Sequence, residues 1–284
     1  MTAGQYILRV SAPDAIGILA DVMSYLANHK LNVVESHDFG DPATRRFFIW
    51  ARFEAEANFQ PDIFSEQFEL LAKQRDIDWS LRLKGHEPRA LLMVSKGDHC
   101  LNDLLYRHRR GRLGTQIIAI VSNHNDAQWH ADRHDIPFYC IPVSKETKAD
   151  AEESLLNLIE ETNTDLVVLA RYMQILSDHA ARQLEGRCIN IHHSALPSFK
   201  GAKPYHQAHE RGVKLIGATA HYVTADLDEG PIITQDVASV DHRMTADKMA
   251  ELGKDIEARV LARAVTAHAE GRVFLNQKRT VVFE

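Results

Sequence analysis

The sequence is poor in cysteine and proline and contains no long apolar run. Only three cysteines and nine prolines occur among its 284 residues. Cys100, Cys140 and Cys188 are too few and too scattered for a disulfide framework, so we expect reduced, structural thiols. No apolar stretch reaches the length of a membrane span, and the first residues lack the basic flank and apolar core of a signal peptide. We therefore expect a protein of the cytoplasm that does not enter the membrane.

The chain also has fewer basic than acidic residues. Lysine and arginine number 33 against 39 acidic residues, for a formal net charge of -6. The single dense basic run, RHRRGR at 107–112, is typical of a solvated helix end, so we do not expect nucleic acid as a partner. With 45% hydrophobic and 25% charged residues, the composition is that of a globular protein, and the length suits two domains.

Residues 1–84 alternate between apolar and polar side chains. The segments RRFFIWARFE (45–54) and IDWSLRLK (77–84) show this period most clearly, and it is typical of strands with one face covered and the other facing water. Apolar residues at helical spacing lie within 19–26 and 64–71. The predicted order is βαββαβ, a small ferredoxin-like domain.

The turn SAPDAIG (11–17) resembles the ligand-sensing ACT domain, in which Pro-Asp-x-x-Gly joins the first strand to the first helix; the matching residues are Pro13, Asp14 and Gly17. Asp14 is a good helix N-cap, and Gly17 allows close approach to the backbone. The resemblance implies a regulatory or oligomerisation domain with an effector site at Asp14 and Gly17, an amino acid being the candidate ligand. A turn that only shapes the helix start is an equal interpretation.

The pattern changes in residues 85–284. ALLMVS (90–95), QIIAIVS (116–122) and DLVVLA (165–170) are continuous apolar runs, as expected for strands buried on both faces of a parallel sheet. We predict a second domain with a mostly parallel, Rossmann-like β/α fold, ending in a long helix over about 245–270 and a hairpin.

Ligands in such sheets bind beyond the carboxyl ends of the strands. This rule groups four segments around one crevice: 95–98, 122–125, 170–174 and 191–194.

Polar side chains follow one of these buried strands, in CINIHHSALPSFKG (188–201). Asn190 and His192 are two apart and therefore share a face of the strand. An amide can donate a hydrogen bond to a developing oxyanion, and an imidazole can move protons near neutral pH. Downstream, HYVTADLDEGPIITQ (221–235) carries Asp226 and Asp228, and a carboxylate folded onto His192 would favour its protonated form. The set indicates carbonyl chemistry through a tetrahedral intermediate, or a structural hydrogen-bond network.

The same segments carry a resemblance to a known family. NIHHSALPSFKG together with GATAHYVTADLDEGPIITQ resembles the formyltetrahydrofolate-dependent formyltransferase fold, which implies Asn190, His192 and Asp228 as the catalytic residues. His193 stands where glycinamide ribonucleotide formyltransferases have proline. With LARYMQIL, VSKGDHCLNDLL and the ACT-like domain, the whole chain is similar to the formyltetrahydrofolate deformylases.

That resemblance implies hydrolysis of 10-formyltetrahydrofolate to formate and tetrahydrofolate, which supplies formate for purine biosynthesis and balances one-carbon folate pools. The folate is then the substrate, with no separate cofactor or metal. The implied substrate contacts are Met173, Ile175, Leu176, Ala225, Asp226, Leu227 and His193, with Lys203 and Tyr205 as secondary groups. SKGDHC (95–100) has one glycine and places Asp98 where a transferase would hold a phosphate, which favours water as the nucleophile.

Three other interpretations stay open. The chain could be a formyltransferase acting on an amine, or a non-catalytic amino-acid or folate sensor. Sixteen histidines also raise the question of a metal, although none forms a His-Glu-x-x-His run. The histidines considered are His130 with His134, His206 with His209, and His192, His193 and His221 near the acidic pair. An exposed strand edge in the first domain predicts a homo-oligomer.

Overall fold

The computed structural model describes residues 4–196 and 204–284. Lys203 lies outside the described residues. The chain divides into two compact units: the residues up to His86 together with Glu270–Glu284, and Glu87–Ala269. The predicted division assigned all of 85–284 to the second domain, whereas in the structure the last residues pack with the first unit.

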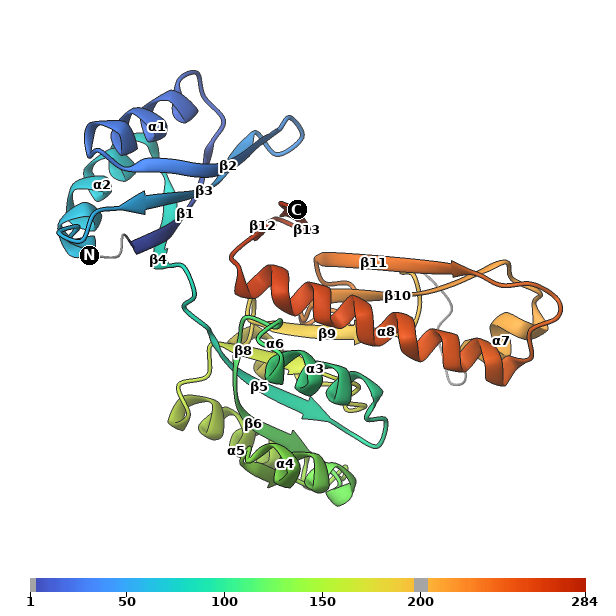
Figure 1. Ribbon diagram of the computed structural model, residues 1–284. Coiled ribbons are helices and arrows are strands. Elements are labelled where there is room, and N and C mark those ends of the chain that lie inside the picture. Colours follow the sequence, from blue (N-terminus) through green and yellow to red (C-terminus); the bar gives the residue numbers. More distant parts are fainter. Residues whose placement is uncertain (1–3, 197–203) are drawn as a thin grey trace. The chain divides into compact units, whose positions relative to one another are not determined.

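The first unit is a four-stranded antiparallel sheet with two helices, in the predicted βαββαβ order. Its elements are β1 (Gly4–Pro13), α1 (Ile18–Asn28), β2 (Asn32–Asp41), β3 (Arg46–Ala55), α2 (Pro61–Arg75) and β4 (Asp78–Leu83). The strand order is β2-β3-β1-β4, so β2 and β4 are the edges. Both helices pack on the same face of the sheet (Figure 1).

The two faces of this sheet bury different side chains because alternate residues point to opposite sides. Leu8 of β1 and Ile49 of β3 lie in the cluster beneath the helices. Phe48 and Trp50 point the other way, and they are 0% and 5% exposed. The expectation that this second face meets water is therefore wrong for β3.

The C-terminal hairpin covers that second face. It consists of β12 (Val273–Asn276) and β13 (Arg279–Val282). Phe274 and Phe283 pack against Phe48 and Trp50. The indole Nε1 of Trp50 also donates to the carbonyl of Glu270 at 3.2 Å. Apolar contact thus joins the last residues of the chain to its first unit.

The second unit alternates strands and helices. Its elements are β5 (Arg89–Val94), α3 (His99–Arg109), β6 (Gln116–Ser122), the 3-10 turn η1 (Asn125–Ala127), α4 (Gln128–His134), β7 (Phe138–Cys140), α5 (Lys148–Glu161), β8 (Leu166–Leu169), α6 (Asp178–Gln183), β9 (Cys188–His192), α7 (Pro204–Glu210), β10 (Leu215–Tyr222), β11 (Ile232–Ser239) and α8 (Ala246–Ala269). The seven strands are ordered β11-β10-β9-β8-β5-β6-β7.

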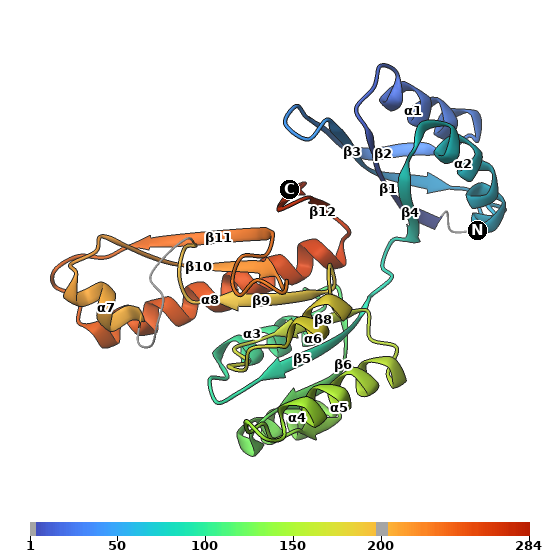
Figure 2. The same ribbon diagram turned by 180° about the vertical axis from the view of Figure 1, so that it is seen from behind.

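This sheet is mixed, as the mostly parallel prediction allows. β7, β6, β5, β8 and β9 are parallel, and β10 and β11 run antiparallel to them. α8 lies along β10 and β9 and packs beside α3, as Figure 2 shows from behind. α5 packs on the cluster that includes Leu91, Val121 and Val167. None of the helices in the described residues is long and apolar enough to cross a membrane.

The helix cap predicted at Asp14 is not formed. Gly17, with φ 90°, is the N-cap of α1 and supplies no side-chain hydrogen bond. The backbone N–H of Asp14 instead donates to the carbonyl of Arg45. A side chain is disfavoured at that φ, so glycine is the residue that suits this left-handed position at the start of the helix.

Candidate active site

The site begins where β9 pairs with β10. Asn190 and His192 lie at the C-terminal end of β9, and both are half-buried. The antiparallel register places His221 opposite Asn190, and Thr219 opposite His192. Both residues of β10 are buried. The predicted common face of Asn190 and His192 is thereby matched by a second pair of polar groups.

Asp228 reaches this pair from the loop between β10 and β11. Its Oδ2 lies 3.2 Å from Nδ1 of His192, and its Oδ1 lies 3.7 Å from Nε2 of His221. The backbone of Asp228 is left-handed, with φ 58°, a region that aspartate tolerates better than most residues. Hydrogen bonding by His192, and then by His221, holds the pKa of Asp228 well below its usual range, against the opposing effect of burial. Asp228 is therefore a carboxylate at neutral pH.

His221 orients the amide of Asn190. Its Nδ1 faces the carbonyl of Tyr222 at 2.9 Å, and a carbonyl can only accept, so Nδ1 carries a proton. In the neutral ring Nε2 is then an acceptor for Nδ2 of Asn190, 3.2 Å away. One N–H of Asn190 is used in this bond.

The loop after β8 joins the site through Ser95. The hydroxyl of Ser95 donates to Oδ1 of Asn123 at 2.7 Å and accepts from the backbone N–H of Met173 at 2.9 Å. The backbone N–H of Ser95 donates to the carbonyl of Arg171. Three of the four segments that were predicted to share a crevice are thus bonded to one another.

The predicted substrate contacts fall into two groups. Met173, Ile175 and Leu227 are large apolar side chains that are 58%, 59% and 58% exposed. Leu176 instead packs on the core cluster under the sheet, as does Val223 before the loop of Asp228. Ala225 and Asp226 are exposed in that loop. Both loops therefore stand on one core cluster and present exposed apolar side chains.

A second layer of polar groups lies behind His192. The ring of His193 stacks on it, with centroids 4.6 Å apart and planes 20° apart. Arg171 contacts His193, and Arg171 also pairs with Glu257 of α8, which is 1% exposed.

One group of metal-type ligands occurs among the described residues: His99, Cys100 and Glu257. Burial, and then the charge of Glu257, raises the pKa of the Cys100 thiol well above its usual value, so the sulfur is protonated. Glu257 already binds His99, Tyr205 and Arg171. A protonated thiol and a carboxylate paired with a guanidinium form a poor cation site.

The other two histidine pairs considered as ligands lie on helices of the second unit. His130 of α4 lies 2.9 Å from a carboxylate oxygen of Asp98, which comes from the start of α3. His206 and His209 lie on α7.

Sequence reasoning did not assign Arg171 or Glu257 to the site. The signal for Glu257 was present, because it falls between Ile256 and Val260 in the apolar stripe of α8. A charged residue in such a stripe is buried only when it is paired. Arg171 carries no comparable signal, since its partners come from distant parts of the chain.

Residues 88–265 match the family model described as formyl transferase. The chain belongs to the formyl transferase family. The crystal structure of glycinamide ribonucleotide transformylase 1 from Symbiobacterium toebii is similar to this chain, with a TM-score of 0.66, 28% identity and coverage of 72% of this chain and 98% of that one.

Full-length similarity narrows the assignment. The formyltetrahydrofolate deformylase of Corynebacterium sp. (strain P-1) is 47% identical over 98% of this chain and 98% of its own length. The crystal structure of formyltetrahydrofolate deformylase from Burkholderia mallei superposes with a TM-score of 0.95 at 48% identity, covering 99% of this chain and 100% of that one. Within the family, the chain belongs with the formyltetrahydrofolate deformylases, as the sequence motifs predicted.

Proposed function

We propose that this chain hydrolyses 10-formyltetrahydrofolate to formate and tetrahydrofolate, and that Asn190, His192 and Asp228 carry the reaction. The proposal is carried by one observation: the carboxylate of Asp228 lies 3.2 Å from His192, beside Asn190, in a chain that matches deformylases over nearly its whole length. The folate is the substrate and supplies the formyl group, so the reaction draws on one-carbon metabolism and releases formate for purine synthesis.

The chemistry follows from the acceptors and donors of the site. Water attacks the formyl carbon while Nε2 of a neutral His192 takes one of its protons, and a C–O bond forms. The resulting oxyanion accepts hydrogen bonds from an N–H of Asn190 and from the newly protonated His192, which then delivers that proton to N10. Asp228 accepts from Nδ1 of His192, which directs Nε2 away from the carboxylate and toward the substrate. As the C–N10 bond breaks, a proton from the attacking water ends on N10, and formic acid ionises to formate.

The low pKa of Asp228 bears on which group takes the water's proton. A carboxylate that binds protons so weakly is a poor final acceptor. In this proposal Asp228 orients the water and His192, and the proton reaches N10 by way of His192.

A formyl transfer to an amine is the second candidate, and the start of α3 disfavours it. Asp98 is the N-cap of α3, and its carboxylate binds His130. A carboxylate at that position repels the phosphate of a ribonucleotide acceptor, which a helix N-terminus would otherwise attract. Water then remains as the nucleophile.

Formate release tests the proposed function directly. Purified protein given 10-formyltetrahydrofolate with no amine present is expected to release formate and tetrahydrofolate in equal amounts, with and without a chelator. Release only after an amine is added would replace hydrolysis by transfer, and release abolished by the chelator would require a metal in the mechanism.

We also propose that the protein lies in the cytoplasm and forms a homo-oligomer. Cys100, Cys140 and Cys188 are free thiols, and Cys140 is exposed, which suits a reducing compartment such as the cytoplasm. β2 is an edge strand with Val34 and Phe39 exposed, and an edge of this kind can pair with a second copy in a homo-oligomer.

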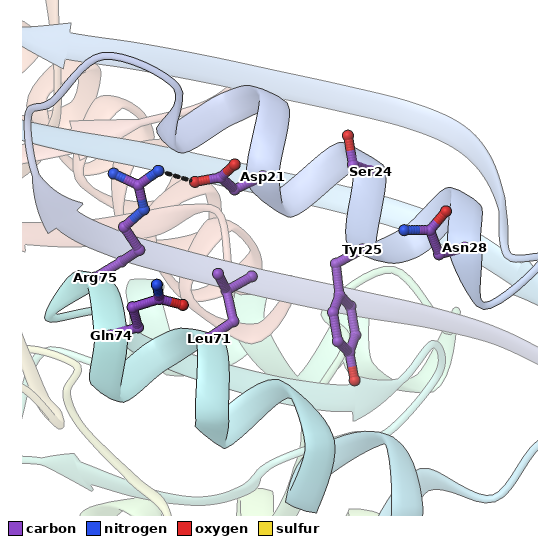
Figure 3. Close-up of a pocket in the computed structure, with 7 residues that line it drawn as sticks. All are labelled: Asp21, Ser24, Tyr25, Asn28, Leu71, Gln74 and Arg75. Atoms are coloured by element: carbon purple, nitrogen blue, oxygen red, sulfur yellow. Dashed lines mark ion pairs between the residues drawn. The ribbon is translucent and has the colours of Figure 1, made fainter.

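An amino-acid effector site in the first unit is also proposed, near Asp14 and Gly17. A pocket of about 280 Å³ lies between α1 and α2, with the ion pair of Asp21 and Arg75 at one end (Figure 3). Arg75 lies 3.7 Å from the point where a Cβ on Gly17 would stand, so the pocket adjoins the predicted turn. An arginine and an aspartate can bind the carboxylate and the ammonium of one amino acid.

Regulation is tested by titrating each common amino acid against the rate of formate release. At least one is expected to change the rate severalfold, and Arg75→Gln is expected to weaken that response while leaving the basal rate unchanged, because Arg75 belongs to the other unit. If no amino acid alters the rate, the first unit has no effector role of this kind.

A further inference from the structure

The second unit buries a carboxylate near the residues proposed for catalysis. Glu257 of α8 is 1% exposed. Tyr205 donates its hydroxyl proton to Oε1 at 2.7 Å, and Nε2 of His99 lies 2.9 Å from Oε2. Gly253, one turn earlier, leaves room for the ring of Tyr205, because a Cβ there would stand 2.1 Å from that ring. The sequence of α8 is thus fitted to hold this carboxylate in place.

Glu257 is ionised. Burial acts to raise its pKa, but the hydrogen bond from His99, the charge of Arg171 and the hydrogen bond from Tyr205 outweigh burial and lower it. The third partner, Arg171, places its Nε 3.4 Å from Oε2. A buried carboxylate that holds a half-buried guanidinium forms an anchor, because removing the cation would leave the carboxylate without a partner charge.

Arg171 extends from that anchor to the active site. Its Nη1 lies 3.2 Å from Nδ1 of His193. A guanidinium has no acceptor, so Nδ1 of His193 must accept, and the ring is the neutral tautomer with its proton on Nε2. The backbone of Arg171 is left-handed, with φ 67°, which is costly for a side chain of this kind. Strain of that type is retained where the surrounding contacts require it.

His193 in turn lies flat against His192. The charged or titratable groups that face it are His192, Arg171, Glu257 and Asp228. Burial, and then the neighbouring His192 and Arg171, lowers the pKa of His193 to about 4. The ring stays neutral while the reaction runs near neutral pH.

We propose that Arg171 is a positioning residue for the reaction: anchored by Glu257, it holds His193 as a neutral ring against the face of His192. A ring fixed there restricts rotation of His192, which keeps Nδ1 on Asp228 and Nε2 toward the substrate. The role rests on the proposed hydrolysis and acts through His193, so it requires no contact between Arg171 and the folate.

A double-mutant cycle tests this route of action. Arg171→Met is expected to lower kcat about tenfold and to change KM by less than about twofold, because it loosens the orientation of a catalytic group rather than the binding surface. His193→Phe keeps a ring but cannot accept from Arg171. In that background, Arg171→Met is expected to cause no further loss. Losses that multiply in the double variant would overturn the proposal.

A matched control and a second variant support the cycle. Arg182→Met removes an exposed arginine from α6 of the same unit and is expected to retain wild-type kcat. Arg171→Lys keeps a cation beside Glu257 but lacks the planar fork that reaches two partners, so it is expected to lose kcat as Arg171→Met does. It replaces the methionine variant in the cycle if that variant does not fold. Full activity of a folded lysine variant would contradict the role of the fork.

The pH titration of His193 provides a readout that does not depend on turnover. In ¹³C-histidine-labelled protein, the ring of His193 is expected to titrate at higher pH in Arg171→Met than in the wild type, because the charge of Arg171 contributes to its lowered pKa. An unchanged titration would remove the bond on which the proposal stands. The proposed function fails separately, since it is lost only if the unaltered chain releases no formate.

Discussion

Replacing Asp228 by asparagine is expected to lower the rate of formate release by roughly two orders of magnitude or more, with the fold intact. The amide is nearly the same size, but it carries no charge and cannot accept with both atoms. His192 then loses the partner that orients its ring, and the water loses its acceptor. The measurement is kcat at saturating 10-formyltetrahydrofolate, together with the thermal melting temperature of the variant.

Glu229→Gln is the matched control, because Glu229 is an exposed acid in the same loop. It removes one negative charge from the same surface and is expected to keep wild-type turnover. If Asp228→Asn turned over at near the wild-type rate, the three residues assigned to catalysis would be wrong.

Gly230→Ala is expected to lower the free energy of unfolding by about 3 kcal/mol and to abolish most activity. A Cβ at Gly230 would stand 1.8 Å from the carbonyl oxygen of Tyr222, which is backbone and cannot rotate away. The same carbonyl accepts from His221, so moving it disturbs the orientation of Asn190 as well. Thermal melting is expected to show a fall of roughly 6 to 12 °C for a unit of this size.

Gly97→Ala tests whether any alanine in place of glycine has this effect. The nearest atom to a Cβ at Gly97 is 3.9 Å away, an ordinary contact. Its melting temperature is expected to match the wild type. A Gly230→Ala variant that melts with the wild type would mean that the loop of Asp228 can shift without cost.

Much of the architecture follows from local patterns. Alternation in β3 and β4 predicted the first sheet, and the apolar runs of β5, β6 and β8 predicted the parallel part of the second. The face shared by Asn190 and His192 also follows from their spacing, because a strand repeats every two residues. These features depend on neighbours in sequence, which a single chain displays directly.

Other features required the folded chain. Phe48 and Trp50 are apolar on the face that was expected to meet water, and they mark the place of a hairpin far along the sequence. The contact of His221 with Asn190 depends on the register between β9 and β10. Arg171 and Glu257 meet only because α8 packs against the sheet, and periodicity contains no information about that pairing.

The hairpin at the end of the chain makes the second unit an insertion within the first. During synthesis from the N-terminus, the strands of the first unit leave the ribosome well before residues 270–284 exist. Phe48 and Trp50 must then remain uncovered until the whole second unit has been made, although their sheet has its other face filled. The unit that begins first can therefore be completed only after the end of the chain has been made, and a nascent or truncated chain carries an open aromatic surface that favours association with other chains.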